Sequence, residues 1–448
     1  MEAGLLGWAA VVFVGVLGWG VRPTGLWAAL VGVAAVGAAR ASGWANLVPV
    51  GYTPGGGVYP GGSSTYLVGH PDGGVAAADF KFVCLGLFAL AGVAAVRAAG
   101  YETLLVGITA VAAGLLTFGV DNLVSLYLTL ELQALALYTL VGFYKFDEER
   151  IDAAVRYLLT GSLVSGFMLL AFARGYGANG TFHLVEFTRH DPVGSAWTAG
   201  VIFFKVGVFP FHFWSPVVYA PLEWGTLAVV LGATKVNVWY LLGRTFAPAV
   251  ESVWWPVWWA AAASVVVGSI GGYFQTNVAS LLAYSGVING GYLLFLWCAH
   301  RDGGFGFGYY AGVYFGGTLL LVVALSVFGD TKLTGFTAWG KLGVAYPLVV
   351  YYLALNVAGL PVFPGFAAKL VLLRETVPFG WAALAVLVAA SVAPAVYYVN
   401  TATAALFGYV DREVTPPVEV SPLWVAPAVV ALAGGVTTVV ALVSGGVA

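Results

Sequence analysis

Residues 199–244 read AGVIFFKVGVFPFHFWSPVVYAPLEWGTLAVVLGATKVNVWYLLGR, and they place two lysines inside long apolar runs. Lys205 lies near the middle of the first run and Lys235 near the middle of the second. The connector between them is rich in proline and aromatic residues and contains His212. An ionised side chain at the centre of a membrane helix costs about 2.5–3.5 kcal/mol even on the lenient insertion scale. Both lysines are therefore candidate functional residues if these runs cross a membrane.

The composition of the chain is that of a polytopic membrane protein. Of its 448 residues, 60% are hydrophobic and 8% are charged, and the mean hydropathy is +0.92, which is far from the values of a soluble domain. Apolar runs of about 17–25 residues recur along the whole length, as membrane-spanning helices require. The strands of a membrane barrel would alternate in polarity instead. We therefore predict an all-α bundle.

The apolar runs predict about 14 membrane-spanning helices. Their expected ranges are 3–20, 24–42, 80–98, 102–119, 122–144, 154–174, 197–219, 223–245, 254–273, 278–298, 307–328, 346–373, 379–407 and 423–444. The first run begins without a basic segment or a cleavage site, so no removed signal is expected. Lys and Arg are spread almost evenly over alternate sides, and the positive-inside rule therefore gives no orientation.

Two polar segments are expected to lie outside the bilayer. One is the Gly- and Pro-rich loop 43–79, and the other is the insert 175–197, which contains His183 and His190. No further ligand near these histidines completes a metal site, so solvated side chains are expected. Cys84 and Cys298 lie in apolar runs without metal spacing and are interpreted as small core residues.

Two further charged residues lie inside predicted spans. Glu131 and Lys369 have positions comparable with those of Lys205 and Lys235. Four unpaired charges at bilayer depth would cost on the order of 10–14 kcal/mol, so they must be paired, hydrated or neutralised. A structural ion pair with Glu131 can account for one lysine and leaves two without an acidic partner. Proton handling is therefore the favoured interpretation.

Helix breaks are predicted beside two of these lysines. Pro210 and Pro216 follow Lys205, and the segment PVFPG at 361–365 precedes Lys369. A proline inside a span removes a backbone hydrogen bond, and the broken backbone must be covered by protein or water. Broken helices that carry charges in corresponding halves of a chain are typical of an ion site in an inverted-repeat transporter.

The predicted spans divide the chain into four regions. These are residues 1–99, with helices 1–3 and the loop 43–79; residues 100–245, a first repeat with helices 4–8; residues 254–407, a second repeat with helices 9–13; and residues 408–448, with helix 14. The two five-helix repeats are expected to be inverted relative to each other, with helices 7 and 12 broken.

Several motifs in order resemble the antiporter-like membrane subunits of respiratory complex I. They are LYLTLELQALALYTLVGF, AAVRYLLTGSLVSGFMLL, FFKVGVFPFHFWSPVVY, ATKVNVWYLLGR, NVASLLAYSGVINGGYLL and GLPVFPGFAAKL. The resemblance covers roughly residues 100–375. It implies that Glu131 is the family's fifth-span glutamate, that Lys205 and Lys235 are the seventh- and eighth-span lysines, and that Lys369 is the twelfth-span residue on the exit side.

Within this family, the chain resembles the subunit 2 type, called subunit N in bacteria. A neighbouring type carries glutamate at the position of Lys369, and the most distal type adds a lateral helix for which the chain has no room. The connector SPVVYAPLEWGTL departs from the family pattern, and the loop 43–79 has no counterpart in it. The residue usage favours a mitochondrial inner membrane, with a bacterial cytoplasmic membrane as the alternative.

The resemblance implies proton translocation through a mid-membrane relay. Glu131 would set the proton affinity of Lys205, Lys235 would continue the relay with His212 as a further candidate, and Lys369 would release the proton. No nucleotide loop, flavin motif or iron–sulfur cysteines occur in the sequence, so no cofactor, metal or nucleic acid is expected on this chain. NADH, FMN, iron–sulfur clusters and ubiquinone are expected in partner subunits of the complex I membrane arm and beyond.

Three alternatives remain open from sequence. A subunit of a multisubunit Mrp-type cation/proton antiporter would share these spans. A stand-alone inverted-repeat transporter for an anionic solute would use the half-helix ends near Pro210 and Pro364. A structural spacer that does not pump would keep the fold without the relay.

Overall fold

A computed structural model describes most of the chain from residue 101 to residue 407. The described residues are 101–117, 120, 122–143, 146–184, 187, 192–245, 250–299, 305–325, 345–361 and 363–407. The predicted spans 3–20, 24–42, 80–98 and 423–444, the loop 43–79 and Cys84 lie outside them.

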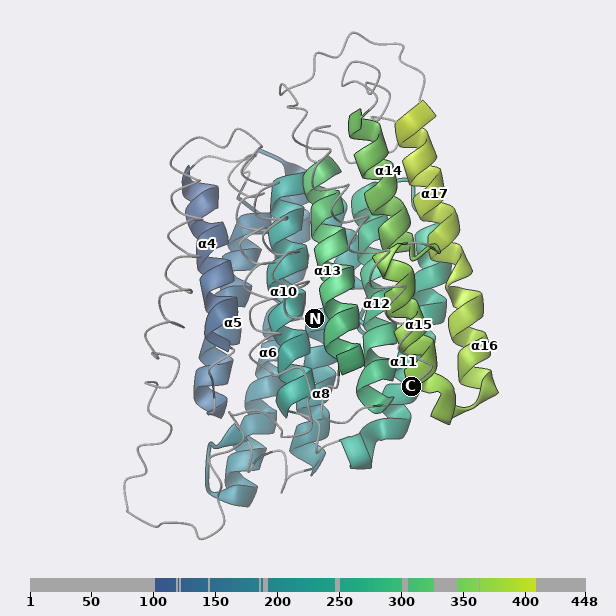
Figure 1. The fold of residues 1–448 in the computed structure, drawn as a ribbon. Helices are drawn as coiled ribbons and strands as arrows, with labels where there is room; N and C mark the ends of the chain where they lie inside the picture. The colour runs from purple at the N-terminus through teal and green to yellow at the C-terminus, as the bar shows by residue number, and fades with distance from the viewer. Residues whose placement is uncertain are drawn as a thin grey trace, which may run out of the picture.

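The described part of the chain is a bundle of helices without a β-strand (Figure 1). The helices are α4 (Tyr101–Leu116), α5 (Leu123–Val141), α6 (Glu148–Asn179), α8 (Pro192–Val206), α9 (Trp214–Tyr219), α10 (Trp224–Thr245), α11 (Val250–Tyr273), α12 (Val278–Ala299), α13 (Phe305–Leu325), α14 (Ala345–Ala358), α15 (Pro364–Thr376), α16 (Trp381–Ala390) and α17 (Val392–Phe407), with a 3-10 turn at Val377–Phe379. In Figure 1, α4 and α5 lie at one side, α14–α17 at the other, and α10 and α13 between them. The all-α prediction is confirmed; the count of 14 spans and the inverted repeats stay predictions.

Four stretches within the described residues are long and apolar enough to cross a membrane. They are Leu123–Val141, Glu148–Asn179, Val278–Ala299 and Ala383–Thr401. The outer face of α6 leaves large apolar side chains such as Leu163 and Phe167 more than half exposed. Exposed apolar side chains in such number suit contact with lipid or with neighbouring membrane helices.

Helix α6 is longer than the predicted span 154–174. The Asp147 side chain accepts a hydrogen bond from the Arg150 backbone N–H at its start, and Gly180 ends it in the left-handed conformation with φ 67°. Its 32 residues correspond to about 48 Å, which exceeds a hydrocarbon core of about 30 Å. Both ends of the segment 175–197 are helical, because α6 continues to Asn179 and α8 begins at Pro192. Its place outside the bilayer stays a prediction.

The two predicted helix breaks are present. Helix α8 ends at Val206 and is followed by Gly207 with φ 73°, before the short helix α9. Helix α14 ends at Ala358 and is followed by Gly359 with φ 70°, before α15 starts at Pro364. In both cases a glycine adopts a left-handed conformation that other residues disfavour. The predicted span 379–407 is also interrupted, between α16 and α17 at Ser391.

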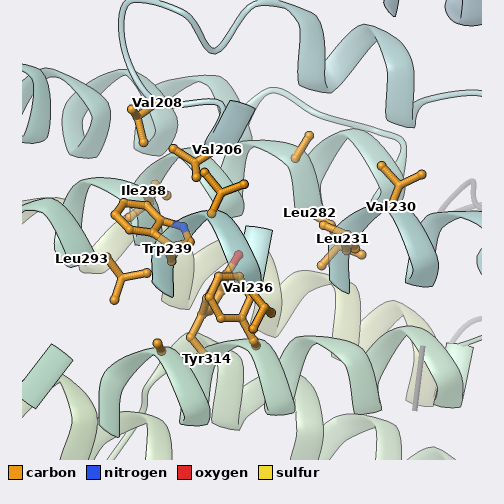
Figure 2. Packing of buried hydrophobic residues seen from close by; sticks show 14 of the residues in the cluster. Val206, Val208, Val230, Leu231, Val236, Trp239, Leu282, Ile288, Leu293 and Tyr314 are labelled. Carbon is orange, nitrogen blue, oxygen red and sulfur yellow. The ribbon is translucent and has the colours of Figure 1, made fainter. Parts of the chain in front are cut away.

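The core between α10, α12 and α13 is tightly packed (Figure 2). Trp239, Ile288 and Leu293 are at most 1% exposed. Glycines permit this packing where helices cross closely. Gly268 of α11 lies so near α12 that an added Cβ would be 2.6 Å from Ile288 Cγ1 and 2.9 Å from the Ile288 backbone nitrogen.

We expect Gly268→Ala to destabilise the bundle by about 1–3 kcal/mol, because one of the obstructing atoms is backbone and cannot rotate away. Thermal unfolding of the protein in detergent measures the effect. The control is Gly166→Ala in α6, where no atom lies within 4 Å of the added Cβ. Equal unfolding temperatures for both variants would contradict the proposed close crossing of α11 and α12.

Candidate functional site

Glu131 and Lys205 lie in the same part of the bundle. Glu131 is partly buried on α5, and one carboxylate oxygen, Oε2, accepts a 2.7 Å hydrogen bond from Ser165 Oγ of α6. The Glu131 charge acts on Lys205, which is partly buried in the last turn of α8. No direct ion pair between the two is present among the described contacts. The structure therefore brings the predicted pair into electrostatic range without joining it.

Lys205 lines a cavity of about 30 Å³, which is the volume that the centre of a water molecule can reach. One water needs about 10–15 Å³ on this measure, so the cavity has room for about two. Its polar lining includes Gln133, Tyr138 and Tyr157. A water here would lie beside the lysine, at the point where α8 is about to break.

Side chains satisfy the backbone around the first break. The Phe209 N–H donates to Ser264 Oγ of α11 at 2.9 Å, and Trp214 Nε1 of α9 donates to the Phe204 carbonyl of α8 at 2.8 Å. Because unpaired backbone groups are costly in a membrane, these two contacts stabilise the interruption beside Lys205.

His212 lies in the segment between α8 and α9 and is partly buried. Its ring centroid is 5.9 Å from that of Phe209, and its Nδ1 atom is buried without a hydrogen-bond partner in the described part of the chain. No contact joins it to Lys235 there, so its place in a relay remains a prediction.

Lys235 is the most deeply buried of the three lysines, with 2% exposure on α10. Its Nζ atom has no hydrogen-bond partner among the described residues, and it lies 5.5 Å from the centroid of the Tyr219 ring. A lysine over an aromatic face at this distance makes a cation–π contact. Gly286 of α12 makes the room: a Cβ there would collide with Lys235 Nζ.

An amide pair lies between the surroundings of the first two lysines. Asn237 Nδ2 of α10 donates to Gln133 Oε1 of α5 at 2.9 Å, and Gln133 Nε2 donates to the Ala110 carbonyl at 3.3 Å. Gln133 also lines the Lys205 cavity, while Asn237 follows Lys235 by two positions. Sequence reasoning did not single out this pair, although two amides inside apolar runs are the signal that could have found it.

A buried hydroxyl and amide cluster follows on α12. Ser285 Oγ accepts from Tyr398 Oη at 2.8 Å, and Asn289 Oδ1 accepts from Tyr310 Oη at 2.6 Å. Asn289 Nδ2 donates to the Ser285 carbonyl at 2.8 Å. These side chains come from α12, α13 and α17, and sequence reasoning missed the cluster because tyrosines are frequent throughout the chain.

Lys369 lies at the second break. Its Nζ atom donates a 2.6 Å hydrogen bond to the Ala358 carbonyl at the end of α14. On the other side of the break, the Gly365 N–H at the start of α15 donates to Asn356 Oδ1 at 2.9 Å. The lysine therefore satisfies backbone that the interruption leaves free. Asn356 is a second residue of this site that the sequence analysis did not name.

The chain matches the model of the family described as NADH:quinone oxidoreductase/Mrp antiporter, transmembrane, over residues 120–393. This match covers more than half of the 448 residues, and the chain belongs to this family.

Within the family, the chain is similar to bacterial subunit N of NADH-quinone oxidoreductase. It is 30% identical over 306 residues to subunit N of Hydrogenovibrio crunogenus, a match of 62% of this chain and 63% of that protein. It is 30% identical over 318 residues to subunit N 2 of Solibacter usitatus, with 66% and 64% covered. The matches thus span slightly less than two thirds of these relatives. The resemblance drawn from the motifs, including the subunit N type, is confirmed.

Solved structures share the fold. A chain of respiratory complex I from Thermus thermophilus with bound aureothin superposes with a TM-score of 0.72 at 23% identity, covering 98% of both chains. A chain of the Mrp complex from Dietzia sp. DQ12-45-1b superposes with a TM-score of 0.65 at 20% identity, covering 82% of this chain and 81% of that one. At these sequence identities, the comparison shows a shared fold alone.

We expect Asn356→Leu to destabilise the protein by about 1–3 kcal/mol, because the partly buried Gly365 N–H loses its acceptor. Thermal unfolding in detergent measures the loss. Asn400→Leu is the matched control, since Asn400 is exposed on α17. A stability loss no larger for Asn356→Leu than for the control would show that the second break does not depend on this hydrogen bond.

Proposed function

We propose that the chain is a proton-translocating membrane-arm subunit of an NADH:quinone oxidoreductase, of the subunit N type. Membership in the family and similarity to subunit N support this assignment. The observation that carries the proton-handling part is Lys205, which lies at a helix break, beside a cavity with room for water and within the field of Glu131. A lysine so placed can exchange a proton with water while an acidic neighbour adjusts its charge.

In the proposed mechanism, protons move along the interior of the bundle. The negative charge of Glu131 stabilises the protonated form of Lys205, and loss of that charge favours release of the proton from Lys205. The Gln133–Asn237 pair orients polar contacts between Lys205 and Lys235. Lys235 receives the proton in a site where the described residues place no carboxylate beside the ammonium, so that it also gives the proton up. Lys369 passes it outward at the second break. Coupled groups of this kind titrate together.

The redox chemistry belongs to other subunits in this proposal. NADH, FMN, iron–sulfur clusters and ubiquinone bind to partners in the complex, and their reactions reach this chain as conformational or electrostatic coupling. The subunit N proteins that the chain resembles in sequence are bacterial. We therefore place the chain in a bacterial cytoplasmic membrane rather than a mitochondrial inner membrane. Its partners are the other membrane-arm subunits and lipids.

The fold likeness to an Mrp complex chain supports a second candidate, a subunit of a multisubunit cation/proton antiporter. The similarity to subunit N favours the first candidate. Affinity purification from native membranes separates them: quinone-reducing subunits should accompany the chain, whereas Mrp partners would overturn the assignment. Transport by the purified single chain in liposomes would instead indicate a stand-alone transporter.

We expect Lys205→Ala in the assembled enzyme to lower NADH-driven proton pumping and coupled turnover by about tenfold or more, as loss of an acid–base group does. Acidification of inverted membrane vesicles measures pumping, and the level of assembled complex is measured in the same membranes. The control is Arg156→Ala, which removes a cation from an exposed pair with Asp152 on α6. Full pumping by Lys205→Ala would refute the role of this lysine.

We expect Glu131→Gln to lower pumping about tenfold and Glu131→Asp to lower it less, because aspartate keeps the charge with a shorter reach. The same vesicle assay compares the two variants. Ser165→Ala, which removes the hydrogen bond to Glu131 but not the carboxylate, serves as the control for local packing. Equal losses in Glu131→Gln and Glu131→Asp would indicate that shape, and not charge, matters at this position.

A further inference from the structure

We propose that the Tyr314 hydroxyl on α13 is a relay group that passes protons between Lys235 and the second helix break. This role of Tyr314 rests on the proposed proton translocation. The inference comes from three sets of contacts that meet at this one side chain.

The first set places Tyr314 beside Lys235. A Cβ added at Gly286 would collide with Lys235 Nζ and would lie 3.8 Å from Tyr314 Oη. The ammonium and the hydroxyl therefore approach the same glycine of α12 from two different helices. Figure 2 shows the Tyr314 side chain rising from its helix toward Val236, the residue after Lys235. A side chain at position 286 would fill the space between the two groups.

The second set fixes the surroundings of the hydroxyl. The Tyr314 side chain lies near those of Ser285, Asn289 and Thr318. Ser285 Oγ already accepts a hydrogen bond from Tyr398, and Asn289 Oδ1 already accepts one from Tyr310. These acceptors are thus partly engaged. Thr318 Oγ1, which is buried and has no partner among the described residues, is the acceptor that remains.

The third set leads from Thr318 to the second break. The preceding residue, Gly317, packs against α14 so closely that an added Cβ would be 2.7 Å from Asn356 Nδ2. Asn356 holds the start of α15 through the Gly365 N–H, and Lys369 lies one turn further along α15. Tyr314 and Thr318 lie one turn apart on α13, and Gly317 beside Thr318 packs against Asn356 at the break.

The proton step is balanced at each group. The Lys235 ammonium gives one proton to Tyr314 Oη, through a water or after the two atoms move into hydrogen-bond distance, while the Tyr314 O–H gives its own proton to Thr318 Oγ1 or to a water beside it. Lys235 becomes a neutral amine and Tyr314 remains a neutral phenol. The same exchange along Thr318 or water delivers one proton to the neutral amine of Lys369. Phenylalanine at position 314 keeps the ring and removes the oxygen that this exchange needs.

The test is Tyr314→Phe in the assembled complex, with NADH-driven acidification of inverted vesicles as the readout. We expect the pumping rate to fall about tenfold, as expected when a positioned proton-transfer group is removed, at an unchanged level of complex. The matched control is Tyr292→Phe, because Tyr292 is 1% exposed and its hydroxyl has no hydrogen-bond partner in the described structure. We expect this control to pump normally.

A solvent isotope effect separates proton transfer from packing. The ratio of pumping rates in H2O and D2O should be larger in Tyr314→Phe than in the unmodified enzyme, because proton transfer then limits the rate. Gly286→Ala, which displaces Lys235 Nζ, should also lower pumping while Tyr314 is retained. Normal pumping by Tyr314→Phe would overturn the inference. It would also be overturned if Tyr314→Phe and Tyr292→Phe lowered pumping equally and both variants contained less assembled complex.

The same assay distinguishes this inference from the proposed function. If Lys205→Ala abolishes pumping while Tyr314→Phe pumps normally, the Tyr314 relay is refuted and proton translocation stands. If Lys205→Ala also pumps normally, proton translocation through this chain is refuted, and the Tyr314 relay with it.

Discussion

The need to pair every backbone polar group inside a membrane governs this structure. A continuous helix meets that need by itself, whereas a broken helix requires help from elsewhere. Ser264 supplies the acceptor at the first break and Asn356 supplies it at the second. Each break is therefore a site where several helices must meet. The two helix breaks occur beside Lys205 and Lys369 because charged and polar groups can be accommodated in the same places.

The two breaks use different donors. At the first, the indole of Trp214 donates to a carbonyl of α8, and Lys205 is left beside a cavity. At the second, Lys369 itself donates to a carbonyl of α14. Lys205 is thus placed to meet water, and Lys369 is held by backbone. In the proposed relay, this difference suits an order in which Lys205 exchanges protons with water inside the bundle and Lys369 lies at the end of the path.

The charges and breaks could be predicted from sequence because their cost in lipid is large and local. Lys205 and Lys369 are charged residues in apolar runs, and the nearby prolines predict a helix break within a few residues of each. The amide pair Gln133–Asn237 and the hydroxyl contact Tyr398–Ser285 join residues 104 and 113 positions apart. No short-range pattern indicates which tyrosine among 23 meets which serine. Helix α6 extends at both ends beyond the predicted span 154–174, because a helix can continue past the bilayer.

The hydrogen bond from Lys369 to the Ala358 carbonyl makes one nitrogen serve two purposes. The same atom binds the proton and closes the end of α14, so proton affinity and backbone geometry at this point are thermodynamically linked. Linkage is reciprocal: a force that bends α14 against α15 alters how tightly the proton is held, and binding the proton resists the bend by the same free energy. In the proposed function, the second break would convert mechanical strain between α14 and α15 into a change in the proton affinity of a single amine.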